Sequence, residues 1–429
     1  MFYQRPKTKD QRLKTNTNNP LTLPQNQKSP HSSFMEPTQT REKPVILFIH
    51  NTYLQKGGED SVVQNEMETL QQNGYTVYYK EFNNKAFQKP GMGSLFVPVN
   101  VFFNLTAFFS IYFFVKKKKV PLVHVHNFFY NASPSVFWAA KAAGARTFFT
   151  LHNYRLFCLN GIFFRAGSVC MDCHTAGNFK KGVAEKCFKS SRLFSGLLAQ
   201  STLLHRKAGT WKNKVDRFVV INPFMKELLT DIGIAGEKII FKPNVFTEYD
   251  HQGIPQYAER SDFYLFVGRL SVEKGIEHLV KAFQRSGKKL VIVGDGELSG
   301  FVRQNISEQI LYRGPLPKNE VLSLYRSCKA LVFPSLWLEG MPMTLIEAQS
   351  AGTICIVAES VNTKNMIRND HNGFLYEAGN ITSLNQVIDI FEAKSAEEKK
   401  LLAENAYHQF LEKYAETQFI RTAEELYLR

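Results

Sequence analysis

Short apolar runs of strand length alternate with helical segments along this chain, and this alternation constrains its fold most. The runs lie at residues 45–50, 76–79, 122–126, 146–151, 218–221 and 239–242, with helical patterns at 61–73 and 134–143. The same alternation begins again at residue 263. Strands that alternate with helices indicate parallel sheets covered by helices on both faces. The sequence therefore predicts an α/β protein with two doubly wound parallel sheets, joined by a hinge at about residues 242–257.

The predicted organisation of the 429 residues has four parts. Residues 1–43 hold few large apolar side chains, so we expect a disordered tail. Residues 44–245 form the first domain, with a cysteine-containing insertion at about 155–195, and residues 256–405 form the second. Residues 406–429 are expected to be a helix that packs back across the domains. The tail lacks the apolar core of a signal peptide, which favours a cytoplasmic protein, and Met35 is an alternative start.

Positive charge is concentrated in the first domain. Residues 44–245 carry 25 Lys and Arg against 11 Asp and Glu, a net of +14, whereas residues 246–429 carry 20 against 24. A basic domain usually faces an anionic partner, such as a phospholipid surface, a lipid-linked phosphate or a nucleic acid.

A Phe-rich stretch without charges, residues 95–115, lies directly before the four lysines 116–119. Its length would permit a membrane span. However, it contains Pro98 and several polar residues, and it lies between strands that should pair in one sheet. We therefore expect a helix of the first domain that lies partly on an anionic membrane with its lysines at the headgroups. A wholly buried helix with a solvated lysine cap is the alternative.

Two glutamates eight positions apart, Glu339 and Glu347, follow the strand pattern at residues 330–335. The pattern places Glu339 on a loop and Glu347 on the first turn of a helix that begins near Thr344. Ionised carboxylates accept hydroxyl hydrogens, as a ribose or hexose offers them, and the helix N-terminus offers amides to phosphate.

Groups suited to phosphate stand at the ends of the two preceding strand patterns. The first strand of the second domain ends at Gly268, and Arg269 and Lys274 follow it at the start of a helix, where cations would neutralise a pyrophosphate. The next strand, 289–293, ends in Gly294, Asp295 and Gly296, a turn that would let backbone approach a flat base closely.

These residues resemble the retaining glycosyltransferases of family 4, which have the GT-B fold: two Rossmann-like domains facing each other across a cleft. The shared motifs are the glutamate pair, the Gly-Arg-Leu and Glu-Lys-Gly block, the Gly-Asp-Gly turn and an amino-terminal Gly57-Gly58-Glu59 loop. The resemblance extends from about Pro44 to the last helix.

The resemblance implies roles for particular residues. Catalysis would fall to Arg269, Lys274, His152 and Glu339, with His152 and Glu339 at the donor sugar. Glu347 would bind the ribose. The remaining nucleotide-sugar contacts would come from Gly57, Gly58, Gly268, Gly294, Asp295, Gly296, Met341, Pro342, Met343 and Thr344. Pro342 departs from the family, which often has a second glycine there.

The resemblance also implies transfer with retention of the anomeric configuration. The sequence contains no Asp-x-Asp pair, and Arg269 with Lys274 could stabilise the diphosphate leaving group, so we expect no catalytic metal or other required cofactor.

His124 and His126 alternate on a strand and share a face. They are either polar residues at the carboxyl end of the strand with no functional role, or residues that act in the cleft.

Four of the six cysteines cluster at Cys158, Cys170, Cys173 and Cys187. Two thiols spaced C-x2-C, with two outlying ones, can complete a tetrahedral zinc site, and His174 is a spare ligand. Free or transiently oxidised thiols are the alternative. Cys328 and Cys355 lie in apolar runs and are expected in the core.

The expected partners are a UDP- or GDP-sugar donor, a glycan or lipid-linked acceptor of bacterial surface polysaccharide or lipopolysaccharide assembly, and the inner face of the cytoplasmic membrane. Two other classes stay open. A nicotinamide-dependent oxidoreductase shares the doubly wound sheet, but the first strand lacks the G-x-G-x-x-G turn after it. A nucleic-acid-binding protein would explain the basic half, but no recognition module is visible, so we expect no nucleic-acid partner.

Overall fold

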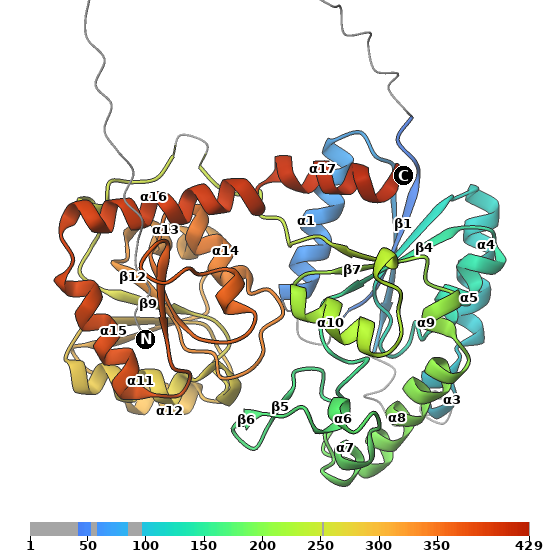
Figure 1. The fold of residues 1–429 in the computed structure, drawn as a ribbon, viewed down its shortest axis with the longest axis horizontal. Helices are drawn as coiled ribbons and strands as arrows, with labels where there is room; N and C mark the ends of the chain where they lie inside the picture. Colours follow the sequence, from blue (N-terminus) through green and yellow to red (C-terminus); the bar gives the residue numbers. More distant parts are fainter. Residues whose placement is uncertain (1–41, 53–57, 85–96, 251–252, 429) are drawn as a thin grey trace, which may run out of the picture. The chain divides into compact units, whose positions relative to one another are not determined.

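The computed structural model describes residues 42–52, 58–84, 97–250 and 253–428. Residues 43–429 form one compact unit. It contains two six-stranded sheets, and every pair of neighbouring strands in them is parallel. Figure 1 shows the strands and the helices that cover them. The predicted α/β class with two doubly wound sheets is confirmed. The predicted disordered tail, apart from its last residues, lies outside the described residues, as does Gly57.

The first sheet has the strand order β2-β1-β3-β4-β7-β8. Its strands are β1 (Ile46–Thr52), β2 (Val77–Asn83), β3 (Leu122–Asn127), β4 (Arg146–Leu151), β7 (Arg217–Val220) and β8 (Ile239–Phe241). The main helices around it are α1 (Gly58–Gln72), α3 (Val97–Phe102), α4 (Leu105–Lys118), α5 (Ser135–Ala142), α8 (Arg192–Lys207), α9 (Thr210–Asn213) and α10 (Pro223–Asp231). Buried apolar residues of α4, α5, α8, α9 and α10 form one core cluster with this sheet, while α1 contributes to a second.

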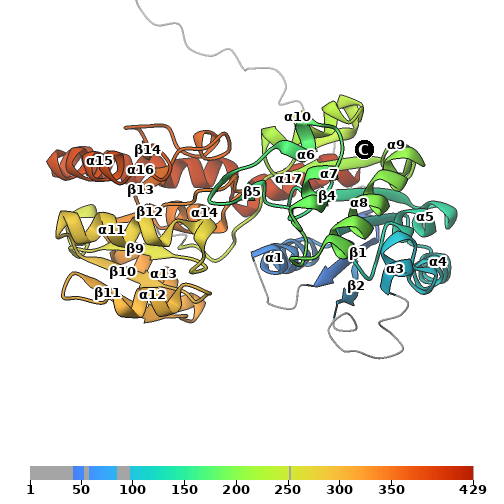
Figure 2. The same cartoon turned by 90° about the horizontal axis from the view of Figure 1, so that it is seen from below.

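The second sheet has the order β11-β10-β9-β12-β13-β14, the arrangement of dinucleotide-binding folds. Its strands are β9 (Tyr264–Val267), β10 (Leu290–Val293), β11 (Ile310–Gly314), β12 (Ala330–Phe333), β13 (Cys355–Ala358) and β14 (Gly373–Tyr376). Helices α11 (Ile276–Ser286), α12 (Ser299–Gln304) and α15 (Ile381–Ala393) share one core cluster with it. Helices α13 (Lys318–Ser327), α14 (Met343–Ser350) and α16 (Ala396–Lys413) share the other. Figure 2 gives a second view of this layering.

The last helix, α17 (Glu416–Tyr427), belongs to the core of the first sheet although it follows the second. Phe419, Ala423, Leu426 and Tyr427 pack with residues of β1, β3 and β4. A buried ion pair between Lys242 and Glu66 lies in the same region, with the ammonium 4.8 Å from the ring centre of Phe419. The predicted boundary at residue 406 falls inside α16, which continues to Lys413.

The Phe-rich stretch forms two helices, α3 and α4, so the expectation of one helix is wrong. The break is at Asn104, whose side chain caps α4 by accepting a hydrogen bond from the amide of Ala107 at 3.1 Å. The same side chain donates to the carbonyl oxygen of Asn131 at 2.6 Å, which ties the break to the loop after β3. None of the helices in the described residues is both long and apolar enough to cross a membrane.

Candidate active site

The strand order of the second sheet reverses between β9 and β12, which are hydrogen-bonded neighbours. In open α/β sheets, ligands bind beyond the carboxyl ends of the strands at such a point. The chain after β9 carries Gly268, Arg269 and Lys274, and the chain after β12 carries Glu339. The fold therefore brings the predicted phosphate-binding and carboxylate segments to the same edge.

Glu339 is a buried carboxylate held by three donors. Its Oε1 accepts from Lys274 Nζ at 2.6 Å, from Trp337 Nε1 at 2.7 Å and from the hydroxyl of Ser335. The side chain of Glu339 is 5% exposed and that of Lys274 is 20% exposed, so the pair is largely shielded from water. Charge-assisted hydrogen bonds of this kind are shorter and stronger than neutral ones. Sequence reasoning named Glu339 and Lys274 but missed Ser335 and Trp337, which lie four and two residues before the carboxylate.

Side chains on other loops fix the backbone around Glu339. Tyr154 donates its hydroxyl hydrogen to the Glu339 carbonyl oxygen at 3.2 Å, and Asn362 also donates to that oxygen. Asn222 Nδ2 donates to the carbonyl oxygen of Gly340 at 2.7 Å. These donors come from the loops after β4, β7 and β13, so three separate segments converge on the glutamate loop.

Glycines allow the loops at this edge to pack closely. A Cβ on Gly294 would lie 1.9 Å from the carbonyl oxygen of Gly268, and one on Gly296 would lie 2.4 Å from that of Leu270. The Gly-Asp-Gly turn thus seats the loop after β10 against the loop after β9. Gly275 does the same toward β12, because its Cβ would lie 2.0 Å from the Pro334 carbonyl oxygen. This last position was not among the predicted site residues.

Asp295 is tied into the same turn. Its backbone oxygen accepts from the Leu270 amide at 2.9 Å, and its Oδ1 accepts from the Gly296 amide at 2.9 Å and from Ser299 Oγ. These hydrogen bonds hold the pKa of the Asp295 carboxyl below its usual range. Asp295 is therefore ionised at neutral pH and shapes the turn.

Arg269 and Lys274 differ in their partners. Lys274 is paired with Glu339, whereas the exposed Arg269 forms no side-chain hydrogen bond or ion pair with any residue that the structure describes. An unpaired guanidinium at the end of β9 is free to take a bidentate anion such as phosphate.

Glu347 lies one residue further into its helix than predicted, just past the first turn. Helix α14 begins at Met343 with Pro342 as its N-cap residue, so Glu347 is its fifth residue. Burial raises the pKa of the Glu347 carboxyl, against the lowering effects of Lys318 and of the Tyr325 hydroxyl, which donates to Oε2 at 3.2 Å. Met343 and Thr344 open the helix, where amides have no intrahelical acceptor. Met341 is fixed before it by hydrogen bonds from Asn244 to its sulfur and carbonyl oxygen, each at 3.3 Å.

Three neighbouring strands of the first sheet carry a His-Asn pair at or beside their carboxyl ends, and two of these histidines contact each other. His126 Nδ1 and His152 Nε2 are 3.1 Å apart. Burial lowers the pKa of both imidazoles well below the usual value, so both rings are neutral at pH 7. The carbonyl oxygen of His152 is 3.2 Å from where a Cβ on Gly340 would stand, which places His152 directly beside the glutamate loop.

Gly58, a predicted site residue of the first domain, is the first residue of α1, which follows β1 in the chain.

His124 has a structural role, although the sequence left this open. Its Nδ1 contacts the hydroxyl of Tyr427 in α17 at 2.6 Å, and its Nε2 contacts Thr150 Oγ1 at 2.7 Å. Both ring nitrogens are thus satisfied inside the core. The contact with Tyr427 joins residues 303 positions apart, and no local sequence signal indicates it.

The six cysteines fall into two groups: two lie in the core, as expected, and four line one pocket. Cys328 and Cys355 are fully buried in the core of the second sheet. Cys158, Cys170, Cys173 and Cys187 line a single pocket beside the loop after β4, and all six thiols are free. Across the described residues, no group of three or more His, Cys, Asp or Glu side chains is already arranged to hold a metal ion.

Comparisons with known proteins agree with this geometry. Residues 250–409 match the family described as glycosyl transferases group 1. The chain is 34% identical over 111 residues to the UDP-Gal:alpha-D-GlcNAc-diphosphoundecaprenol alpha-1,3-galactosyltransferase of Escherichia coli, covering 24% of this chain and 28% of that protein. It is 32% identical over 205 residues to the lipopolysaccharide 1,6-galactosyltransferase of Escherichia coli K12, covering 44% of this chain and 56% of that protein. The matched regions thus span between about a quarter and just over half of these relatives.

Solved structures match almost the whole chain. A glycosyltransferase from Rickettsia africae superposes with a TM-score of 0.65 at 17% identity, covering 90% of this chain and 98% of its own. Anabaena Alr3699/HepE, solved with UDP and glucose, gives a TM-score of 0.60 at 14% identity, covering 89% and 99%. At these identities the likeness shows the fold alone. The chain therefore has the GT-B fold, and its residues 250–409 match the group 1 glycosyl transferase family.

Proposed function

We propose that this protein transfers a sugar from a nucleoside diphosphate sugar to a glycan or lipid-linked acceptor. The observation that carries the proposal is the buried Glu339 carboxylate, paired with Lys274 at the reversal point of the second sheet. Arg269 lies on the same loop as Lys274, and its side chain has no partner among the described residues. Hydroxyl-accepting and phosphate-binding groups thus meet where open α/β sheets bind nucleotides. The family match to residues 250–409 supports this assignment.

In this proposal the diphosphate lies against Arg269, Lys274 and the first amides of α14. The two cations and a helix N-terminus stabilise the negative charge that develops on the leaving group, which is the main way such sites accelerate transfer. Glu339 accepts hydroxyl hydrogens from the donor sugar, and Glu347 accepts those of the ribose. Transfer proceeds with retention and without a catalytic metal ion.

Names of relatives guide the choice of substrates. One matching protein uses UDP-Gal and a diphosphoundecaprenol-linked sugar, another is a lipopolysaccharide 1,6-galactosyltransferase, and a third, from Corynebacterium glutamicum, is a GDP-mannose-dependent alpha-mannosyltransferase. We therefore propose a UDP- or GDP-sugar donor and an acceptor of bacterial surface polysaccharide or lipopolysaccharide assembly.

The test is turnover of candidate donors by the full chain with polyprenyl diphosphate sugars or lipopolysaccharide fragments as acceptors. Mass spectrometry should show an acceptor heavier by one sugar, and NMR of the product should show the donor's anomeric configuration. An inverted product would overturn the retaining mechanism. Turnover of nicotinamide cofactors in place of any nucleotide sugar would overturn the transferase proposal itself.

We further propose that α4 rests on an anionic membrane. Its inner side, Ala107, Ile111 and Val115, is buried against the first sheet. Its opposite stripe, Leu105, Phe109 and Phe113, is 62%, 50% and 62% exposed, and three exposed lysines occupy its last turn. An apolar stripe that ends in lysines matches the boundary between acyl chains and anionic headgroups. With the net charge of +14 between residues 44 and 245, it favours the inner face of the cytoplasmic membrane.

The membrane proposal predicts a loss of binding when the apolar stripe is made polar. Phe109→Ser with Phe113→Ser should lower co-sedimentation with vesicles containing 30% phosphatidylglycerol by at least about tenfold, since two exposed aromatic side chains that would enter the acyl-chain region are lost. Leu401→Ser, at an exposed leucine on α16, is the matched control and should bind like the unmodified protein. Equal binding by both variants would contradict the assignment of α4 to the membrane.

A further inference from the structure

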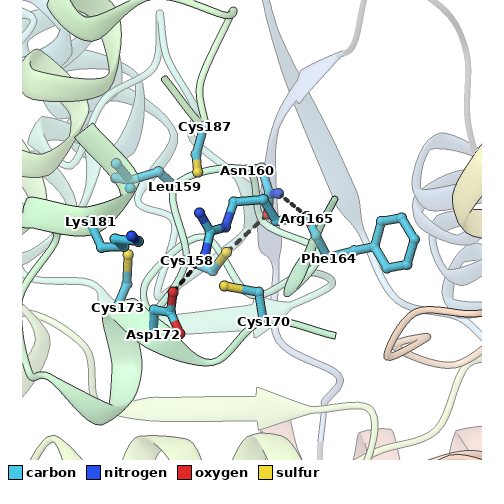
Figure 3. A pocket seen from close by; sticks show the side chains of 11 residues that line it. Cys158, Leu159, Asn160, Phe164, Arg165, Cys170, Asp172, Cys173, Lys181 and Cys187 are labelled. Atoms are coloured by element: carbon cyan, nitrogen blue, oxygen red, sulfur yellow. Dashed lines mark hydrogen bonds and ion pairs between the residues drawn. The ribbon is translucent and has the colours of Figure 1, made fainter. Parts of the chain in front are cut away.

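Four thiols from three segments meet at one pocket beside the candidate active site. Cys158 precedes β5 (Phe164–Arg165), Cys170 and Cys173 follow β6 (Ser168–Val169), and Cys187 follows α7 (Lys180–Ala184). Figure 3 shows the four side chains around a common space. The Cys170–Cys173 pair and the two cysteines outside it in the sequence thus lie together in one cluster.

The backbone at each cysteine is fixed by hydrogen bonds. The Cys158 amide donates to the Tyr154 carbonyl oxygen at 2.8 Å, the Cys170 amide to that of Phe163 at 2.8 Å, and the Cys187 amide to that of Gly182 at 2.9 Å. Gly182 also leaves room for a sulfur, because a Cβ there would lie 2.9 Å from Cys173 Sγ. The backbone positions of Cys158, Cys170 and Cys187 are therefore set by the fold around them, and their side chains can still rotate.

Other metal-binding side chains nearby are already engaged. His174 Nε2 contacts Asp231 Oδ2 at 3.1 Å, and its ring lies edge-on to Phe157. Arg165 pairs with Asp172 at 2.7 Å and with Glu185 at 3.3 Å. These contacts remove the histidine and both carboxylates from a ligand set, which leaves four sulfur atoms.

This segment contains little regular structure. Between β4 and α8 the structure has two two-residue strands, α6 (Asp172–Thr175) and α7. Small loop-rich modules of this kind commonly gain stability from disulfides or zinc.

We propose that Cys158, Cys170, Cys173 and Cys187 bind one structural Zn²⁺. Each thiol releases its proton to solvent as its Zn–S bond of about 2.3 Å forms, and the hydrogen bond from Cys158 Sγ to Asn160 Oδ1 is exchanged for the metal. The thiols do not stand at ligand spacing before metal binds. Rotation of cysteine side chains between their staggered χ1 wells moves the sulfur atoms while the backbone stays in place, and the site closes in this way when zinc binds.

Zinc at this cluster would position the active site through Tyr154. The Tyr154 amide donates to the Gly161 carbonyl oxygen at 3.0 Å, its carbonyl oxygen accepts from Cys158, and its hydroxyl reaches the Glu339 carbonyl oxygen. Metal at Cys158 therefore fixes the turn that carries this hydroxyl. Tyr154 is a positioning residue here, since its hydroxyl contacts backbone of the glutamate loop.

The test is metal content of the full chain, purified without chelators or a polyhistidine tag. Elemental analysis should give one zinc per chain, and Co²⁺ exchange should produce the thiolate charge-transfer and d–d bands of a tetrahedral four-sulfur site. Cys170→Ser with Cys173→Ser should reduce zinc to below about a tenth of that level, whereas His174→Ala should keep it.

Other outcomes overturn the proposal. Zinc below about a tenth of one equivalent after growth with added zinc, with four thiols reactive in the native protein, means that the cysteines are free. A mass lower by two hydrogens per bridge means that they form disulfides. Zinc retained by the double cysteine variant means that the metal lies elsewhere. None of these measurements uses a sugar donor, so their result is independent of the proposed transferase activity.

Discussion

Replacing Lys274 by methionine isolates the ion pair at the centre of the candidate site. The change keeps an unbranched side chain, one atom shorter, but leaves the Glu339 carboxylate buried without its cation. Breaking a fully buried pair in this way costs about 3–5 kcal/mol. Here Ser335 and Trp337 still donate to the same oxygen, and Lys274 is 20% exposed, which places the expected loss of unfolding free energy lower, at about 2 kcal/mol.

Urea denaturation at pH 7 measures this loss, and a double-mutant cycle assigns it to the pair. Glu339→Gln with Lys274→Met removes both charges, so the double variant should be more stable than the sum of the single losses by about 1 kcal/mol or more. A loss below about 0.5 kcal/mol for Lys274→Met, or strict additivity in the cycle, would refute the reasoning, because Lys274 would then be a solvated surface charge.

Three further changes probe other parts of the site. Arg269→Ala should leave the free energy of unfolding within about 0.5 kcal/mol, since the exposed guanidinium pairs with none of the residues that the structure describes. It should lower kcat by about 100-fold in a donor turnover assay, because the guanidinium would stabilise the leaving group, and an equal kcat would contradict this role. Gly294→Ala should cost about 3 kcal/mol or more in urea denaturation, because its Cβ would strike a carbonyl oxygen at 1.9 Å with φ at +133°, whereas Gly300→Ala, with open space around it, should be nearly neutral. Tyr154→Phe removes a hydroxyl that donates to the Glu339 carbonyl oxygen and accepts from Asn362 at 2.7 Å. The free energy of unfolding should fall by about 1–2 kcal/mol, and an unchanged denaturation midpoint would show that these contacts are dispensable.

The fold was predictable because local sequence patterns indicate its strands and helices. Apolar strands that alternate with helices indicate parallel sheets, and the motif residues stand at strand ends, so the meeting of Gly268, Lys274 and Glu339 at one edge follows from topology alone. The close approach at Gly294 could also be read from its glycine, although its partner proved to be another loop of the protein.

What sequence could not provide depends on contacts between distant segments. The break at Asn104 was missed because a single capping side chain, fixed by the loop after β3, overrides a continuous apolar pattern. The role of His124 depends on Tyr427, near the other end of the chain. The Tyr154 hydroxyl reaches the glutamate loop over 185 positions, which no periodicity records.

The central claim is that a nucleoside diphosphate binds at the end of β9 beside Glu339. Thermal stability of the purified chain against UDP, GDP, ADP, CMP and NAD tests it most directly. A ligand of the native state at a hundred times its dissociation constant adds about 2.7 kcal/mol. The account predicts such a shift with UDP or GDP that is lost in Arg269→Ala. No shift with any nucleoside diphosphate, or a shift with NAD alone, would contradict it.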